Sequence, residues 1–161
     1  KKGVIKKIGV SVYSPIELKS VINKYKFDMV QIPINIFDRR FLKKNFLKRI
    51  KSNGIEIHAR SIFMQGILLQ KKESRHKYFR KWENLFLKWD YWNNVRKIKK
   101  VETCLNFLKN LKYIDKLVLG VSSIKAIKEI INILKNEKKL FPKEIFSNSK
   151  QLIEPRLWKK N

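Results

Sequence analysis

The stretch GIEIHARSIFMQGIL, residues 54–68, decides the fold of this chain. Its first half alternates apolar with polar side chains, in the order Ile55, Glu56, Ile57, His58, Ala59 and Arg60. A period of two predicts a strand with one buried face. The alternation stops at Ser61, and Gln65 and Gly66 follow before the next apolar run. A strand that ends in a hydroxyl, an amide and a glycine indicates a place where polar groups meet a ligand.

The same layout of strand, polar turn and helix recurs on both sides of this stretch. Strands are predicted at about 5–12, 27–34, 55–60 and 116–119, and helices at about 15–25, 40–52, 95–111 and 123–134. A segment rich in Lys and aromatic residues, at about 70–94, reads as an insertion with one helix near 78–89. Strict alternation of strands and helices predicts an α/β fold with a parallel sheet, in one domain, or part of a larger one, over 1–161. A carboxyl-terminal tail at about 138–161 is predicted to wrap the surface, anchored by Leu152, Ile153 and Trp158. Four such units fit a small open sheet or half of an eightfold barrel.

Polar residues and a glycine fall at or just past the end of every predicted strand: Ser11, Gln31, Asn35, Arg60, Ser61, Gly120, Ser122 and Ser123. In a βα-barrel these ends converge on one face, and the loops after the last two strands commonly bind phosphate. A glycine admits an anion close to the backbone, and the next helix offers free N–H groups. A serine before a helix is more often only a cap. Because polar groups occur at the same position in all four strand–helix units, we favour half of a barrel over a small open sheet.

The net charge of +26 first suggests a nucleic-acid-binding module. Of the 39 basic residues, however, 31 are Lys, and they are spread through every predicted helix without a long block. The abundance of Lys, Ile and Asn is typical of an AT-rich genome, so compositional drift is favoured over a polyanion site. The single Cys104 excludes an internal disulfide, which is compatible with a reducing cytoplasm without being evidence for one, and no apolar run is long enough to span a membrane. A cytoplasmic location is the expectation.

Several segments together resemble the second half of an aldo/keto reductase, in that family's order: KKIGVSVYS, VQIPINIFDRRFL, GIEIHARSIFMQGILL, IDKLVLGVSSIKAIKEI and LIEPRLW. They are most similar to the branch found beside sugar-nucleotide and surface-polysaccharide genes. The resemblance implies a TIM-type (β/α)8 barrel of which this chain holds strands five to eight. It also implies NADP(H), or NAD(H), bound across the carboxyl face.

The resemblance assigns the cofactor contacts residue by residue. Ser11 and Gln31 fall where the family holds the nicotinamide carboxamide. The loop after strand seven, along the pyrophosphate, corresponds to Ser61, Phe63, Gln65, Gly66 and Leu68. The adenosine end corresponds to Gly120, Ser122, Ser123 and Glu129. Arg60 stands where the family has a Tyr that stacks on the nicotinamide, and a planar guanidinium can stack in its place. Val12 replaces a usual Asn, and Ala126 replaces the Arg that often holds the 2′-phosphate, although Lys125 and Lys128 lie close by.

The family's catalytic Asp, Tyr, Lys and His lie on strands two to four, which this chain does not contain. No catalytic residue is therefore assigned, and no metal site is predicted. His58 lies mid-strand, where a structural role is expected. Half a barrel exposes two sheet edges, so the chain is expected to pair with a separate amino-terminal half, to pair with a second copy of itself, or to be an excerpt of a longer chain. The alternatives are a basic nucleic-acid-binding module and a degenerate remnant without catalysis. The expected substrate, a sugar-like aldehyde or ketone, rests on the resemblance alone.

Overall fold

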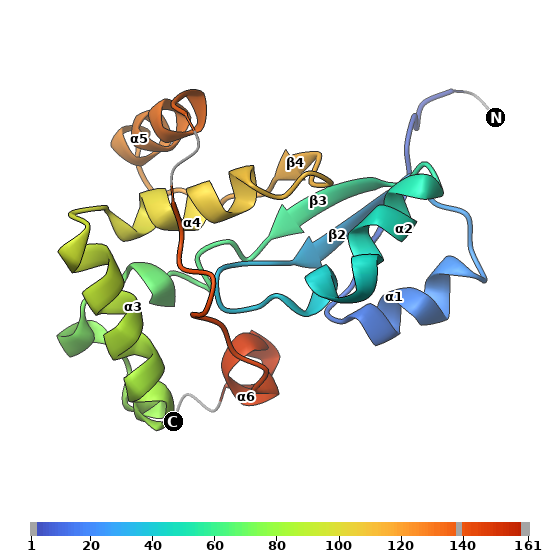
Figure 1. Cartoon of the computed structure of the whole chain (residues 1–161). Coiled ribbons are helices and arrows are strands. Elements are labelled where there is room, and N and C mark those ends of the chain that lie inside the picture. Colours follow the sequence, from blue (N-terminus) through green and yellow to red (C-terminus); the bar gives the residue numbers. More distant parts are fainter. Residues whose placement is uncertain (1–2, 138–139, 159–161) are drawn as a thin grey trace.

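The computed structural model describes residues 3–137 and 140–158. Four parallel strands form one sheet in the order β1-β2-β3-β4. Their bounds are Gly9–Ser11 for β1, Met29–Pro33 for β2, Glu56–Arg60 for β3 and Lys116–Leu117 for β4. In Figure 1 the arrowheads of β2 and β3 point the same way, toward the side of the molecule where α3 lies. The predicted parallel α/β sheet is therefore confirmed.

The helices follow the strands as the alternation predicts. The α-helices are α1 (Pro15–Ile22), α2 (Phe46–Ser52), α3 (Glu83–Val95), α4 (Lys100–Lys109), α5 (Ile124–Lys135) and α6 (Lys150–Ile153). Short 3-10 helices lie between them: η1 (Arg40–Asn45), η2 (Ile67–Leu69), η3 (Lys72–Ser74), η4 (Lys77–Trp82) and η5 (Pro155–Leu157). The start of α1 has the expected cap, since the Ser14 hydroxyl accepts from the backbone N–H of Glu17 at 3.1 Å.

The two faces of the sheet differ in polarity. One face carries Val30, Ile32, Ile57 and Ala59, all fully buried in the core. The other face carries the alternate residues of the same strands, which include Gln31, Glu56, His58 and Arg60, and these are only partly buried. Alternation along each strand produces this division, because successive side chains point to opposite sides.

The outer strands are shorter than the sequence predicts. β1 and β4 lie at the two ends of the sheet order, and each pairs with a single neighbour, β1 over three register positions and β4 over two. Val4, Ile5 and Ile8, ahead of β1, are exposed. The predicted strand at 5–12 is thus reduced to three residues, and the one at 116–119 to two.

Two predicted helices differ from those observed. The segment at 40–52 is a 3-10 helix followed by α2, broken where Lys44 and Asn45 take left-handed φ angles of 53° and 56°. The helix predicted near 78–89 begins at Glu83, because residues 77–82 wind as a 3-10 helix. The helix predicted at 95–111 is shorter: Val95 ends α3, and α4 begins at Lys100.

The carboxyl-terminal segment returns along the molecule and reaches the neighbourhood of α3 (Figure 1). Its predicted anchors Leu152, Ile153 and Trp158 are buried. The Tyr78 hydroxyl donates to the carbonyl of Gln151 at 2.9 Å, and the Phe79 and Trp158 rings meet edge to face at 4.9 Å. Residues 138–139 and 159–161 of the predicted tail lie outside the described residues.

Candidate functional site

The carboxyl edge of the sheet brings the ends of the first two strands together. Ser11 lies opposite Gln31 in the β1–β2 register, and the N–H of Val12 donates to the Gln31 carbonyl at 3.0 Å. Residues that share a register position in a parallel sheet also share a face, so the two polar side chains are neighbours. Ser11 is exposed and Gln31 is partly buried. This pair offers a hydroxyl and an amide on the polar face of the sheet.

Arg60 is the last residue of β3, and its side chain extends to the end of β1. Its guanidinium donates to the carbonyl of Val12 at 3.1 Å and to the Ser61 hydroxyl at 3.2 Å. It lies over the ring of Tyr13, with its central carbon 4.4 Å from the ring centroid. Burial lowers the pKa of Arg60, and its Nε is buried without a hydrogen-bond partner. An unpaired buried donor of this kind needs an explanation, such as a bound group.

Tyr13 joins this edge to the carboxyl-terminal segment. A second guanidinium, from Arg156, lies 3.6 Å from the centroid of the same ring. Arg156 also pairs with Glu17 at 3.2 Å and with Glu154. The Glu17 carboxylate accepts from the backbone N–H of Tyr13 at 2.5 Å, and this hydrogen bond lowers the pKa of Glu17. Sequence patterns missed this cluster because no local spacing links Arg156 to residues about 140 positions earlier.

The loop after β3 has an unusual backbone. Ser61, Met64 and Gln65 have positive φ angles of 57°, 48° and 54°, and Gly66 follows at 85°. Left-handed non-glycine residues are uncommon, and a group of them within a few positions indicates a backbone held in place by its surroundings.

Packing supplies that restraint. Ile62, Met64, Ile67 and Leu68 are buried, and Trp89 donates its indole N–H to the Leu68 carbonyl at 3.0 Å. Of the nominated loop residues, Leu68 is therefore in the core, Ser61, Phe63 and Gly66 are partly buried, and Gln65 is exposed. The apolar side of the loop is fixed in the core while its polar side stays accessible.

The segment after β4 is open to solvent. Gly120, Ser122 and Ser123 are all exposed. The Ser123 hydroxyl accepts from the Ala126 N–H at 3.2 Å and so caps α5. Glu129, one helical turn further, forms an ion pair of 2.7 Å with Lys99. Ser123 and Glu129 therefore both have structural partners, whereas the Ser122 hydroxyl forms no hydrogen bond within the described part of the chain.

Toward the amino ends of the strands, the polar face of the sheet holds a charged cluster. Glu56 bonds to His58 at 2.8 Å, to Lys116 at 2.9 Å and to Lys7 at 2.5 Å. Hydrogen bonds from Lys7, His58 and Lys116 hold the pKa of Glu56 well below its usual range. His58 thus has a carboxylate partner, in agreement with the structural role expected for it.

Within the described ranges, no group of His, Cys, Asp and Glu side chains is arranged to hold a metal ion. Cys104 is buried, and burial raises the pKa of its thiol, which is the state of an unreactive cysteine. In the part of the chain that the structure describes, no helix is both long and apolar enough to cross a membrane.

Known structures share this fold. The chain is similar to an aldo-keto reductase AKR11C1 from Bacillus halodurans, with a TM-score of 0.64 and 18% identity in both the holo and the apo form. It is also similar to a thermostable aldo-keto reductase, Tm1743, solved with the inhibitor epalrestat, with a TM-score of 0.56 and 18% identity. These matches cover 84–86% of this chain but only 45–48% of the matched chains. The chain therefore spans about half the length of these solved structures.

Sequence comparison points the same way. No curated protein sequence matches the chain significantly. A model of the aldo/keto reductase family matches residues 1–153, which is nearly the whole chain. This chain belongs to the aldo/keto reductase family.

Proposed function

We propose that this chain is the carboxyl-terminal half of an aldo/keto reductase barrel, strands five to eight, and that it binds NAD(P)H at the carboxyl edge of its sheet. The observation that carries the proposal is a four-stranded parallel sheet with two open edges, in a chain about half as long as its structural relatives. A closed barrel has no edges, so an open half needs a second half to complete it.

Exposed apolar side chains at both edges support this proposal. Before β1, Ile5 and Ile8 are 73% and 56% exposed. Beyond β4, Val118 and Val121 are about 40% exposed, and α5 presents further exposed isoleucines, namely Ile124, Ile127 and Ile131. Such patches commonly mark an interface. A separate amino-terminal half, or a second copy of this chain, would cover them.

The residues at the carboxyl edge fit a nicotinamide cofactor. Ser11 and Gln31 are adjacent and can hold a carboxamide through a hydroxyl and an amide. The buried, unpartnered Nε of Arg60 lies at the same edge, where a ligand acceptor would satisfy it. The Ser61–Gly66 backbone would follow the pyrophosphate, with Phe63, Gln65 and Leu68 in the same loop. Gly120, Ser122, Ser123 and Glu129 would lie toward the adenosine.

When bound, the cofactor supplies a hydride for reduction of a carbonyl group. On this assignment the chain would contribute binding and orientation only, because the catalytic Asp, Tyr, Lys and His that the resemblance implies would belong to strands two to four. We propose that it is inactive alone, and that the substrate of the completed enzyme is a sugar-like aldehyde or ketone. Lys125 and Lys128, beside the start of α5, would favour NADPH through their charge.

The test is a titration of the whole chain with NADPH and, separately, with NADH, followed by tryptophan fluorescence at moderate salt. Saturable binding that persists as salt is raised is expected. Gln31→Leu removes the amide at nearly constant volume and should weaken binding by roughly tenfold, the effect of losing one or two hydrogen bonds. Gln151→Leu is the control, because Gln151 is exposed on α6. A folded chain without saturable binding, or equal affinities for both variants, would contradict the proposed site.

A further inference from the structure

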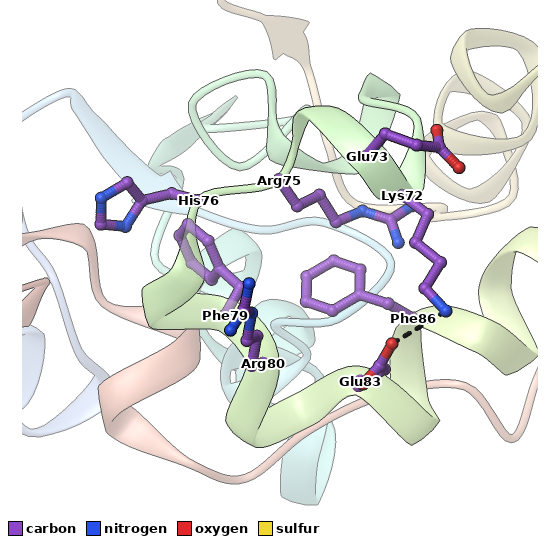
Figure 2. Close-up of a pocket in the computed structure, with 8 residues that line it drawn as sticks. All are labelled: Lys72, Glu73, Arg75, His76, Phe79, Arg80, Glu83 and Phe86. Carbon is purple, nitrogen blue, oxygen red and sulfur yellow. Dashed lines mark ion pairs between the residues drawn. The ribbon is translucent and has the colours of Figure 1, made fainter.

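A cavity of about 440 Å³ lies outside the proposed cofactor site, among η3, η4 and α3. Figure 2 shows its lining, in which the rings of Phe79 and Phe86 form an apolar wall and arginine side chains lie beside them. None of the residues assigned to the cofactor lines it. The volume is within the range of about 300–1,000 Å³ that is usual for small-molecule sites.

Arg75 is the central polar group of this cavity. Its side chain is only 7% exposed, and its guanidinium lies 4.5 Å from the centroid of the Phe86 ring. One nitrogen, Nη2, donates to Asp90 at 2.6 Å and to the Gln70 carbonyl at 3.0 Å. Its Nε is buried and has no hydrogen-bond partner. A buried guanidinium with an unused donor is a preformed site for an acceptor oxygen.

The charges around the cavity favour an anion. Asp90 also pairs with Lys100 at 2.6 Å. The single carboxylate of Asp90 therefore neutralises only one of the two positive charges of Arg75 and Lys100. Lys72 and Glu83 neutralise each other in an ion pair of 3.0 Å, which crosses one end of the cavity (Figure 2).

The remaining charged groups add to this surplus. Arg80 is exposed at the rim, and it has no carboxylate partner among the described residues. In Figure 2 the Glu73 carboxylate extends away from the Phe86 ring, and the His76 ring points out of the cavity on the other side. Arg80 is thus the unpaired cation beside the aromatic wall, and Arg75 shares the single carboxylate of Asp90 with Lys100.

We propose that this cavity binds a small molecule that carries one carboxylate or phosphate group on a flat apolar body. The anionic group accepts from the guanidinium groups of Arg75 and Arg80, and the body packs on Phe79 and Phe86. The site is independent of the cofactor, so its occupancy does not require NAD(P)H or a second half-barrel.

The probe is phenyl phosphate, titrated into the whole chain by calorimetry, with benzoate in a parallel titration. Inorganic phosphate supplies the charge without the ring, and benzyl alcohol supplies the ring without the charge. Phenyl phosphate or benzoate should bind at least about tenfold more tightly than either fragment, because charge-assisted hydrogen bonding and ring burial both contribute. Whichever probe binds more tightly identifies the phosphate or the carboxylate as the preferred anion.

Two variants locate the binding. Arg80→Gln removes the exposed charge and should weaken binding by about tenfold. Arg96→Gln is its control, because Arg96 is also exposed and lies over an aromatic ring, at 4.5 Å from Trp92, at the far end of α3. Arg75→Lys keeps a cation opposite Asp90 but removes the planar guanidinium and its several donors, so it should weaken binding while the chain stays folded.

Equal binding of phenyl phosphate, benzoate and inorganic phosphate would overturn the proposal, and so would equal losses in Arg80→Gln and Arg96→Gln. Undetectable binding of both ring-bearing probes to the folded wild-type chain would also overturn it. Addition of NADPH should leave the affinity unchanged. A failure of NADPH to bind would count against the proposed function but not against this site.

Discussion

At the scale of single residues, Gly66 and Gly120 allow the energetic effect of a left-handed backbone to be measured without steric crowding. Gly66 and Gly120 both have no atom within 4 Å of the position that a Cβ would occupy. Only Gly66 has a left-handed φ, of 85°. An L-residue with a Cβ pays about 1–2 kcal/mol in the left-handed region, whereas elsewhere the change from Gly to Ala restricts mainly the unfolded chain.

Gly66→Ala should therefore lower the free energy of unfolding by about 1–2 kcal/mol. Gly120→Ala should change it by less than about 1 kcal/mol and in the stabilising direction. Urea denaturation followed by circular dichroism measures both. Similar losses in the two variants would mean that the loop after β3 is not held in its left-handed conformation.

The lowered pKa of Asp90 implies that part of the folding stability is lost in acid. Burial alone would raise the pKa of Asp90, but hydrogen bonds from Arg75 and Lys100 outweigh it and lower that pKa. The folded protein thus holds fewer protons than the unfolded chain near the ordinary pKa of about 3.9. The resulting stabilisation is present above that pH and is lost as the pH falls through the lower folded-state pKa.

Asp90→Asn should accordingly be less stable than the wild type at neutral pH and should lose less further stability between about pH 5 and pH 2. The measurement is the urea midpoint at several pH values. Glu73→Gln is the control, since its carboxylate is exposed and has no ion-pair partner among the described residues. An equally steep acid loss in Asp90→Asn and the wild type would exclude this carboxylate as a source of the acid response.

At the scale of elements, α5 tests whether a serine at a strand end is a cap or a ligand group. Ser123 accepts from the Ala126 N–H, whereas Ser122, its exposed neighbour, makes no such bond. Ser123→Ala should lower stability by about 1 kcal/mol, the usual effect of a lost cap. Ser122→Ala should stay within about 0.5 kcal/mol. Thermal or urea unfolding distinguishes them, and the reverse order would contradict the cap.

The elements could be predicted to different degrees from the sequence. The strand Glu56–Arg60 is clear because it alternates strictly and has neighbours on both sides, so its pattern and its environment agree. The break at Lys44 and Asn45 could not be predicted, because Phe41 and Phe46 remain buried and in contact across it, with ring centroids 5.9 Å apart. Apolar spacing is the same for a continuous helix and for two short ones that bury the same rings.

The residues of the candidate site could also be predicted only in part from the sequence. The polar residues at the strand ends could be found from the sequence because each follows an apolar strand. The stack of Arg60 and Arg156 on Tyr13 could not, because it depends on where the carboxyl-terminal segment crosses the sheet edge. The unpaired Nε of Arg75 is likewise a property of packing, since a sequence does not record which donors find acceptors.

At the scale of the whole molecule, two opposing forces govern association. The open edges present apolar surface that favours pairing, and the net charge of +26 opposes it at low salt. The chain is therefore expected to associate with itself at moderate salt in the absence of another partner. Analytical ultracentrifugation across a range of concentrations should show sedimentation that increases with concentration, more strongly at about 0.3 M salt than at about 0.05 M.

Paired substitutions test whether the exposed apolar face of α5 carries this association. Ile124 and Ile131 on α5 are 73% and 45% exposed, and Ile16 and Leu87, on α1 and α3, are 74% and 42% exposed. The variant with Ile124→Asn and Ile131→Asn should shift the chain toward monomer, while the variant with Ile16→Asn and Leu87→Asn should not. The two variants remove similar exposed apolar surface, so a general loss of hydrophobicity cannot explain a difference between them. A monomeric wild type, or equal shifts in the two variants, would mean that the exposed face of α5 is not a surface through which copies of this chain associate.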